Sequence, residues 1–145
     1  MTLKPDDPGS IVPHKGKMLL LSRIIDYDLE EQTLSAEYDI TEDCIFYNPA
    51  IKGVPAWVGI EFIAQAISAL SGIRGHMSGE DPKVGYILSV SSMQIDNHFF
   101  KAGNTVQINV KESGSMDQVY NFEGAVLLEG KKVLDGKLTV IETTD

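Results

Sequence analysis

The sequence predicts an α+β domain in which an antiparallel sheet packs against one long, enclosed helix. Apolar and polar residues alternate on both sides of the middle of the chain, which is the pattern of half-buried strands. Between these regions, residues 55–71 have the composition of a buried helix, and turn-forming residues separate the later strands. A chain of 145 residues is about the size of one domain, so we expect a single domain over 1–145.

Two strands are expected before the helix. The run 18–25, MLLLSRII, is short and apolar, and the acidic residues 26–31 after it indicate a turn or an extension of that strand. Residues 33–40 alternate strictly, and one face would carry Leu34, Ala36, Tyr38 and Ile40. Residues 1–12 are rich in turn and cap formers, and we expect them to be loosely ordered.

The helix is predicted from Pro55 to about residue 71. Proline suits a first turn, and Gly72 follows where a C-terminal cap belongs. The interior polar residues Glu61, Gln65 and Ser68 are spaced i, i+4 and i+7, so they form one narrow stripe. A helix that is apolar everywhere else is enclosed almost all round, and an internal glutamate makes it a poor membrane span. The polar stripe therefore indicates a functional surface, and we expect a second subunit to complete a pocket there.

The rest of the chain predicts strands in an antiparallel meander. Apolar residues alternate over 84–96 with a shift that suggests a bulge near 91–92, and alternation returns over 106–110, 120–128 and 138–140. The expected loops contain Gly103-Asn104, Gly114 and Gly130-Lys131. Together these elements give five to six strands around one helix.

Composition excludes several classes of function. Lys and Arg number 12 against 21 Asp and Glu, a net charge of −9 that opposes nucleic-acid binding. Cys44 is the only cysteine, and the amino terminus lacks the apolar stretch of a signal peptide, so we expect a cytoplasmic protein. There is no metal-ligand spacing, G-x-S-x-G elbow or phosphate-binding loop, and no cofactor or metal is implied.

Three stretches resemble a known family, the hot-dog-fold β-hydroxyacyl-acyl-carrier-protein dehydratases. They are 13–15 (PHK) with 18–23 (MLLLSR), 54–65 (VPAWVGIEFIAQ) and 99–106 (FFKAGNTV), and the middle one resembles a divergent branch found with aryl-polyene-type polyketide genes. The resemblance implies a curved antiparallel sheet wrapped around a central helix, and a homodimer with the active site at its interface. It also implies dehydration of a 3-hydroxyacyl thioester, carried by acyl carrier protein or CoA, to the trans-2-enoyl thioester in fatty-acid-like or polyene biosynthesis.

The resemblance carries over to individual residues. Glu61 matches the catalytic carboxylate, the backbone N–H of Ala56 matches the donor that holds the thioester carbonyl, and Gln65 matches the glutamine one turn further on. The family's catalytic histidine falls at Tyr47, so the usual histidine-based mechanism does not transfer. His14 matches a histidine that the relatives carry beside their catalytic one, which indicates a structural role near the site. With the other histidine absent, His14 is also our candidate for the base, because an imidazole titrates nearest the working pH.

Aromatic residues cluster around the proposed carbonyl site. Phe46, Tyr47, Trp57 and Phe62, with Pro55 at the helix start, predict an apolar tunnel for an acyl or polyene chain, although Phe62 also suits core packing. From the residue pattern alone, Glu61 is either a catalytic carboxyl or a structural buried glutamate. Cys44 is expected to be a small buried thiol, His76 a solvated loop residue and His98 a structural one.

Two other functions remain open at the level of the sequence. A hot-dog thioesterase would use Glu61 to orient a hydrolytic water, and a non-catalytic subunit paired with an active dehydratase would explain Tyr47 most simply. Docking of an acidic carrier protein needs a local basic patch, for which the candidates are Lys15, Lys17, Arg23, Lys52, Arg74 and Lys101.

Overall fold

The computed structural model describes residues 8–12, 16–79, 84–95 and 99–143. Its longest helix is α1, and the remaining elements are strands and short 3-10 turns. In chain order they are η1 (Pro8–Ser10), η2 (Gly16–Met18), β1 (Arg23–Asp28), β2 (Thr33–Asp39), β3 (Gly53–Pro55), η3 (Ala56–Val58), α1 (Gly59–Met77), β4 (Val84–Ile95), β5 (Phe99–Lys101), β6 (Thr105–Met116), β7 (Val119–Leu128) and β8 (Lys131–Thr143).

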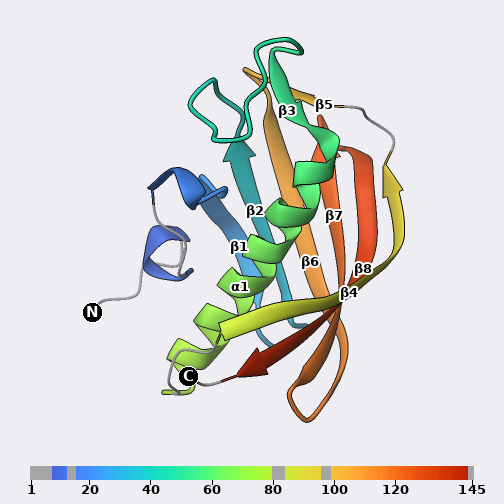
Figure 1. Cartoon of the computed structure of the whole chain (residues 1–145). Helices are drawn as coiled ribbons and strands as arrows, with labels where there is room; N and C mark the ends of the chain where they lie inside the picture. The colour runs from blue at the N-terminus through green and yellow to red at the C-terminus, as the bar shows by residue number, and fades with distance from the viewer. Residues whose placement is uncertain (1–7, 13–15, 80–83, 96–98, 144–145) are drawn as a thin grey trace.

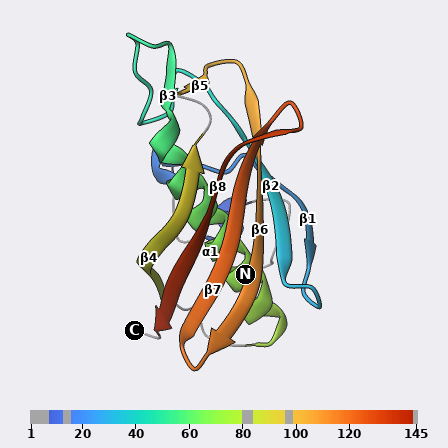
Figure 2. The same cartoon turned by 90° about the vertical axis from the view of Figure 1, so that its right-hand side faces the viewer.

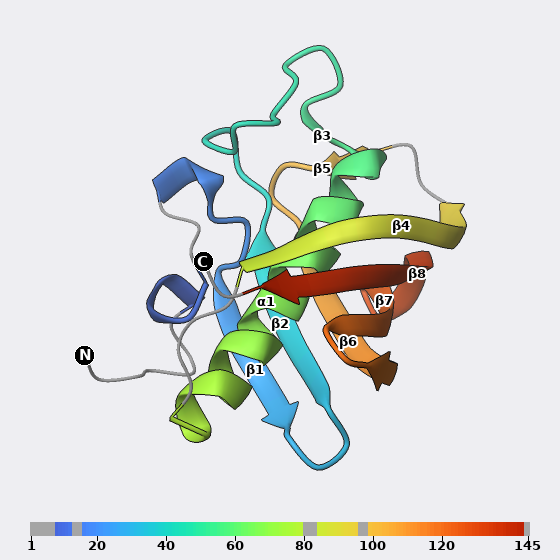
Figure 3. The ribbon, with the colours of Figure 1, turned by 60° about the horizontal axis from the view of Figure 1, so that its bottom comes forward.

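One antiparallel sheet of six strands forms the body of the molecule, in the order β1-β2-β6-β7-β8-β4. Strands β6, β7 and β8 follow one another as the predicted meander, and β2 pairs with β6 in an unbroken register. The sheet curves around α1, with β4 at its far edge passing across the helix (Figures 1 and 3). A separate two-stranded ribbon, β3 and β5, lies at the amino end of the helix. The predicted fold is confirmed.

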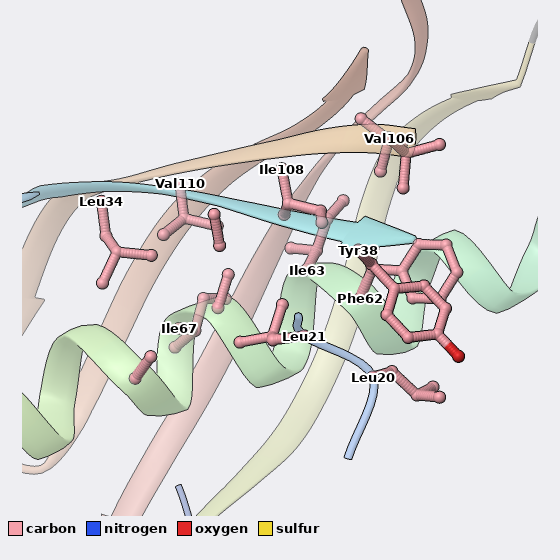
Figure 4. Packing of buried hydrophobic residues seen from close by; sticks show 14 of the residues in the cluster. Leu20, Leu21, Leu34, Tyr38, Phe62, Ile63, Ile67, Val106, Ile108 and Val110 are labelled. Atoms are coloured by element: carbon pink, nitrogen blue, oxygen red, sulfur yellow. The ribbon is translucent and has the colours of Figure 1, made fainter. Parts of the chain in front are cut away.

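The core lies between α1 and the inner face of the sheet. In Figure 4, Ile63 and Ile67 of the helix face Leu34, Ile108 and Val110 of β2 and β6. β2 alternates buried and half-buried residues along its whole length, as the sequence predicts. The helix approaches the sheet so closely at Gly59 that a Cβ there would lie 2.8 Å from Cδ1 of Leu134. A larger residue at that position would require the side chain of Leu134 to move.

Several boundaries differ from the sequence prediction. The first strand begins at Arg23 and not at residue 18, because Leu20 is buried without strand pairing. The helix continues to Met77, six residues past the expected end, and Gly72 is helical. A Cβ on Gly72 would lie 2.7 Å from Cγ2 of Ile11, so this glycine admits the amino-terminal segment and does not cap the helix. Gly114 lies within β6, beside a bulge, and not in a loop.

The amino-terminal segment is more ordered than expected over the part that the structure describes. Residues 8–12 form a 3-10 turn, and Val12 is buried in the core.

The two edge strands of the sheet, β1 and β4, lie on opposite sides of it (Figure 2) and differ in length and charge. β1 is six residues long, carries two aspartates and has a bulge between Ile24 and Asp26. β4 is twelve residues long and has no charged residue. It contains the bulge predicted near residues 91–92, where Ser92 has φ +55°. Its exposed apolar side chains are Tyr86, Ile87, Leu88, Val90 and Ile95. A long uncharged edge of this kind is a template for pairing with another chain.

Candidate active site

The amino end of the helical segment is built by a strand that stops at a proline. β3 pairs with β5 through Val54 and Phe100, and Pro55 then precedes the first helical residue, Ala56. Backbone N–H groups at such an end have no partner within the helix and carry a partial positive charge. The N–H of Ala56 therefore belongs to a set of donors suited to a carbonyl oxygen that gains negative charge.

Glu61 lies in the first turn of α1, five residues after Ala56, and is partly exposed. Its Oε1 accepts a hydrogen bond of 3.2 Å from Nε2 of Gln65, one turn further along the helix. The structure thus brings a carboxylate, a helix amino terminus and a positioned amide into one region. This combination can hold a carbonyl and transfer a proton close to it.

Gln65 does not share the exposure of Glu61. Its side chain is 0% exposed, and it reaches across to the segment that precedes β1. Its Oε1 accepts the N–H of Leu20 at 2.7 Å, and its Nε2 donates to the carbonyl of Met18 at 2.8 Å as well as to Glu61. The expected stripe is therefore divided, because Gln65 lies behind Glu61 in the single chain.

The aromatic residues fall into two groups. The rings of Phe46 and Trp57 meet edge to face at a centroid distance of 5.7 Å, and Trp57 is 58% exposed. Tyr47 is half-buried against the core. Phe62 instead is fully buried between Tyr38 and Phe100, so it packs the core and does not line a channel. Trp57, Phe46 and Tyr47 remain the aromatic candidates at the site.

The described residues do not identify a catalytic base. His14 and His98 lie outside them, and the described histidine, His76, is exposed in the last turn of α1 and not in a loop. At 1.5 Å per residue, His76 is about 22 Å along the helix from Glu61. An imidazole beside Glu61 must therefore come from His14, from His98 or from another chain.

Cys44 is buried, as expected. It lines a cavity of about 340 Å³ together with Tyr38, Asp43 and others. Burial, followed by the hydrogen bond with Cys44, raises the pKa of Tyr38 above its ordinary value, so Tyr38 stays protonated near neutral pH. A second cavity, of about 740 Å³, lies over β2, β6, β7 and β8 and includes Ser35 and Asn109. Glu61 lines neither of these two cavities.

Two of the basic candidates are engaged within the chain. Arg23 bonds to Glu37 and Asp39, and Arg74 bonds to Glu112. Lys52 and Lys101 are exposed side by side on the β3–β5 ribbon, where Lys101 pairs with Gly53. Lys17 is exposed in η2, and Lys15 lies outside the described residues.

The sequence analysis named the alternating apolar residues of β4 but not their exposure. The signal that could have found it is in 84–95, where apolar residues fall on both faces of the strand without any charged residue. An antiparallel strand with one face in the core and one in solvent would alternate apolar and polar residues.

A candidate membrane span over Ala56–Met77 passes the tests of length and hydropathy, but 61% of its window is buried inside the fold. It is the core helix of this domain. No group of three or more His, Cys, Asp or Glu side chains able to hold a metal ion occurs in the part of the chain that the structure describes.

Comparisons with known proteins converge on one family. The model of the ApeP-like family, described as ApeP dehydratase, matches residues 7–145. The 3-hydroxyacyl-acyl-carrier-protein dehydratase FabZ of Protochlamydia amoebophila is 27% identical over 82 residues, which are 57% of this chain and 53% of the relative. FabZ of Legionella pneumophila strain Lens is 25% identical over 126 residues, which are 84% of this chain and 82% of the relative. The chain thus spans about half the length of the first relative.

Solved structures show the same fold at lower identity. A chain of the dehydratase heterocomplex ApeI:P from Xenorhabdus doucetiae has a TM-score of 0.87 and 22% identity, over 100% of this chain and 94% of that one. A hypothetical thioesterase protein with coenzyme A from Streptococcus pneumoniae has a TM-score of 0.63 and 10% identity, over 84% and 85% of the two chains. The architecture is the hot-dog fold.

Proposed function

This chain belongs to the ApeP-like family of dehydratases, and on that premise we propose that it dehydrates a 3-hydroxyacyl thioester, carried by acyl carrier protein, to the trans-2-enoyl thioester. The observation that supports this most directly is the position of Glu61, a partly exposed carboxylate in the first turn of a helix that begins beside Ala56. Fatty-acid-like or polyene biosynthesis is the process in which we place the reaction.

Dehydration requires a donor to the thioester carbonyl, a base and an acid. The N–H of Ala56 holds the carbonyl oxygen while negative charge develops on it. The base removes a proton from C2, the C2–C3 double bond forms, and the C3–O bond breaks. Glu61 protonates the departing hydroxyl, which leaves as water. Pro55 fixes the entry to the helix, and Trp57 and Phe46 contact the acyl chain beside the carbonyl.

Residue 47 departs from the family's histidine, and this affects the base. Tyr47 donates a hydrogen bond to the substrate in our proposal, because a phenol O–H is a hydrogen-bond donor. His14 is the candidate within this chain, and an imidazole of a second subunit is the alternative.

A second hot-dog subunit completes the site. The exposed apolar side chains of β4 and the exposed indole of Trp57 are surfaces that a partner would cover. A homodimer would be isologous, with β4 against β4. The dehydratase heterocomplex among the structural neighbours supports pairing with a different hot-dog chain as the other form.

The carrier protein approaches the ribbon that flanks the helix start. Lys52 and Lys101 are exposed there, whereas Arg23 and Arg74 are engaged in ion pairs, so we retain only the two lysines and Lys17 from the wider patch. The chain's charge of −9 opposes an acidic carrier elsewhere on the surface. The single buried Cys44 suits a reducing compartment, and we place the protein in the cytoplasm.

The replacement of histidine by Tyr47 favours one second candidate, a subunit that shapes the site of an active dehydratase without turnover of its own. A thioesterase is the third, and the shared fold is its support.

One assay separates the three functions. The purified chain is incubated with 3-hydroxyacyl thioesters of carrier protein and of CoA, alone and mixed with a histidine-containing hot-dog dehydratase, and enoyl product and free thiol are both measured. Enoyl product from the chain alone supports the dehydratase. Product that appears only in the mixture, and exceeds that of the added enzyme, identifies the paired subunit. Free thiol without enoyl product identifies a thioesterase. If neither enoyl product nor free thiol forms in any mixture, the proposal is wrong.

A further inference from the structure

The segment between η2 and β1 has backbone groups that no sheet or helix satisfies. Leu20 and Leu21 are buried, yet neither belongs to a strand. A buried backbone N–H group needs a partner, and here a side chain of the central helix supplies it. Gln65 accepts from the N–H of Leu20 and also donates to the carbonyl of Met18, the last residue of η2.

The amide group is the one side-chain chemistry that meets every demand at this position. Oε1 is used once as an acceptor, and the two hydrogens of Nε2 have two acceptors, the carbonyl of Met18 and Oε1 of Glu61. A carboxylate of the same shape could accept from Leu20 but could not donate to either oxygen. An apolar side chain would leave all three groups without this partner.

We propose that Gln65 is a positioning residue that fixes the carboxylate of Glu61 and the segment 16–22 in a single arrangement. The inference rests on the proposed function, in which Glu61 is the acid. One donated hydrogen bond holds Oε1 of Glu61, and the other two hold the backbone of the segment that enters the fold immediately after residues 13–15. A shift of that segment would therefore move Gln65 and, through it, the carboxylate of Glu61. Displacements of about 1 Å in a catalytic group can cost about 10²-fold in rate.

Gln65→Glu is the sharpest variant, because it keeps the shape and changes only the donor. At high pH the introduced carboxylate repels Glu61 and the carbonyl of Met18. At low pH the protonated group can donate one hydrogen bond again. We expect kcat to fall about tenfold or more at pH 8 relative to the original chain, with KM changed less than about threefold, and the deficit to shrink as the pH falls. Gln65→Met should lose kcat to a similar extent at every pH.

Ser71→Ala is the matched control on the same helix. Ser71 Oγ donates to Oε1 of Glu142 at 2.5 Å, so this variant also removes a bond between α1 and the rest of the fold, but one that does not involve Glu61. All variants are assayed in the assembly that gives turnover, at temperatures where circular dichroism shows them folded. Ser71→Ala should keep its kcat and its pH profile.

The outcomes separate the two claims. If the unsubstituted chain dehydrates a thioester and both Gln65 variants keep its kcat and pH profile while only their melting temperatures fall, Gln65 is merely structural and the inference is wrong. If the unsubstituted chain gives no turnover in any assembly, the proposed function fails and takes the inference with it. A kcat loss in Gln65→Glu that does not depend on pH also contradicts the hydrogen-bond mechanism.

Discussion

Carboxylates lie at both ends of helix α1, but they are accessible at the amino end and buried in ion pairs at the carboxyl end. At the amino end, Glu61 is partly exposed and Trp57 projects from the surface. At the carboxyl end, Arg74 bonds to the side chains of Gln32 and Glu112, and its guanidinium lies 3.9 Å from Glu142. The side chains of Glu112 and Glu142 are only 6% and 7% exposed, against 27% for Arg74.

The difference lies in where each carboxylate finds its partners. The chain itself closes the carboxyl end, where Arg74 also lies over the ring of Tyr120 and Ser71 bonds to Glu142. Buried carboxylates need such pairing, because an uncompensated buried charge is costly. At the amino end the carboxylate stays accessible beside a helix terminus. The carboxyl end, which we call the closed end, therefore stabilises the fold, and the amino end, which we call the open end, is accessible to a substrate. Single substitutions can test this contrast.

The largest expected effect is that of Glu61→Gln at the open end. The change keeps the size and the hydrogen-bonding capacity but removes the ionisable proton, so turnover should fall about 10²-fold or more. The free energy of unfolding should change by less than about 0.5 kcal/mol, because the side chain is partly exposed. Turnover assays and urea denaturation of the same preparation measure both quantities. A stability loss with unchanged turnover would make Glu61 structural.

The second test asks whether the open end is completed by another subunit. Leu88 lies at a register shift of β4 and is exposed, and Leu88→Lys should weaken assembly about tenfold or more and lower turnover with it. Ile25→Lys is the matched control, since Ile25 is an exposed apolar residue at the bulge of the opposite edge strand, β1. Sedimentation at several concentrations reads both variants. Equal effects at the two edges would contradict the assignment of β4.

The third test addresses the closed end. Arg74→Met leaves two buried carboxylates without their cation and should cost about 2 kcal/mol of folding free energy, less than the ~3–5 of a fully buried pair because Arg74 is partly exposed. Lys132→Met, which removes an exposed pair with Asp135, should cost less than about 1 kcal/mol. Denaturant titration gives both values. Turnover per folded molecule should be unchanged, and a large loss would erase the contrast between the two ends.

The smallest effect should come from an exposed pair away from both ends. Hydrogen bonds from Arg23 and then Thr105 lower the pKa of Asp39 below its ordinary 3.8. The resulting stabilisation is present above pH 3.8 and is lost as the pH falls through the lowered pKa. Asp39→Asn should therefore cost less than about 1 kcal/mol at pH 7, and the difference should vanish in acid. A difference that persists at low pH would indicate a cause other than charge.

The elements that follow a simple period were predictable from the sequence. β2 has its expected face, the bulge near 91–92 is present, and α1 occupies the expected stretch. The end of α1 was not predictable, because Gly72 resembles a cap locally, whereas in the structure it lies within the helix and is in close contact with Ile11. The predicted start of β1 was wrong for a similar reason. Leu20 satisfies its N–H with a side chain 45 residues away, which no local pattern reveals.

The candidate site was predictable in part. The structure brings Glu61, Ala56 and Trp57 to one end of the helix, where the resemblance expected them. The hydrogen bonds from Gln65 to the backbone of Met18 and Leu20 were not predictable, because the i+4 spacing that places Gln65 one turn after Glu61 says nothing about which element lies across from it. For Phe62 the sequence left a channel and core packing open, and the structure places it in the core, where Tyr38 and Phe100 enclose it.

The open edge of β4 also sets a condition on the supply of this protein. In the heteropair that we propose as one form, a chain made in excess of its partner leaves the twelve uncharged residues of β4 uncovered and open to pairing with other strands. Because a partner that binds only the folded form stabilises it by mass action, the melting temperature of the chain should rise with the concentration of that partner. Surplus chains of such a pair would be more exposed to aggregation and degradation, so recombinant yield should improve on co-expression.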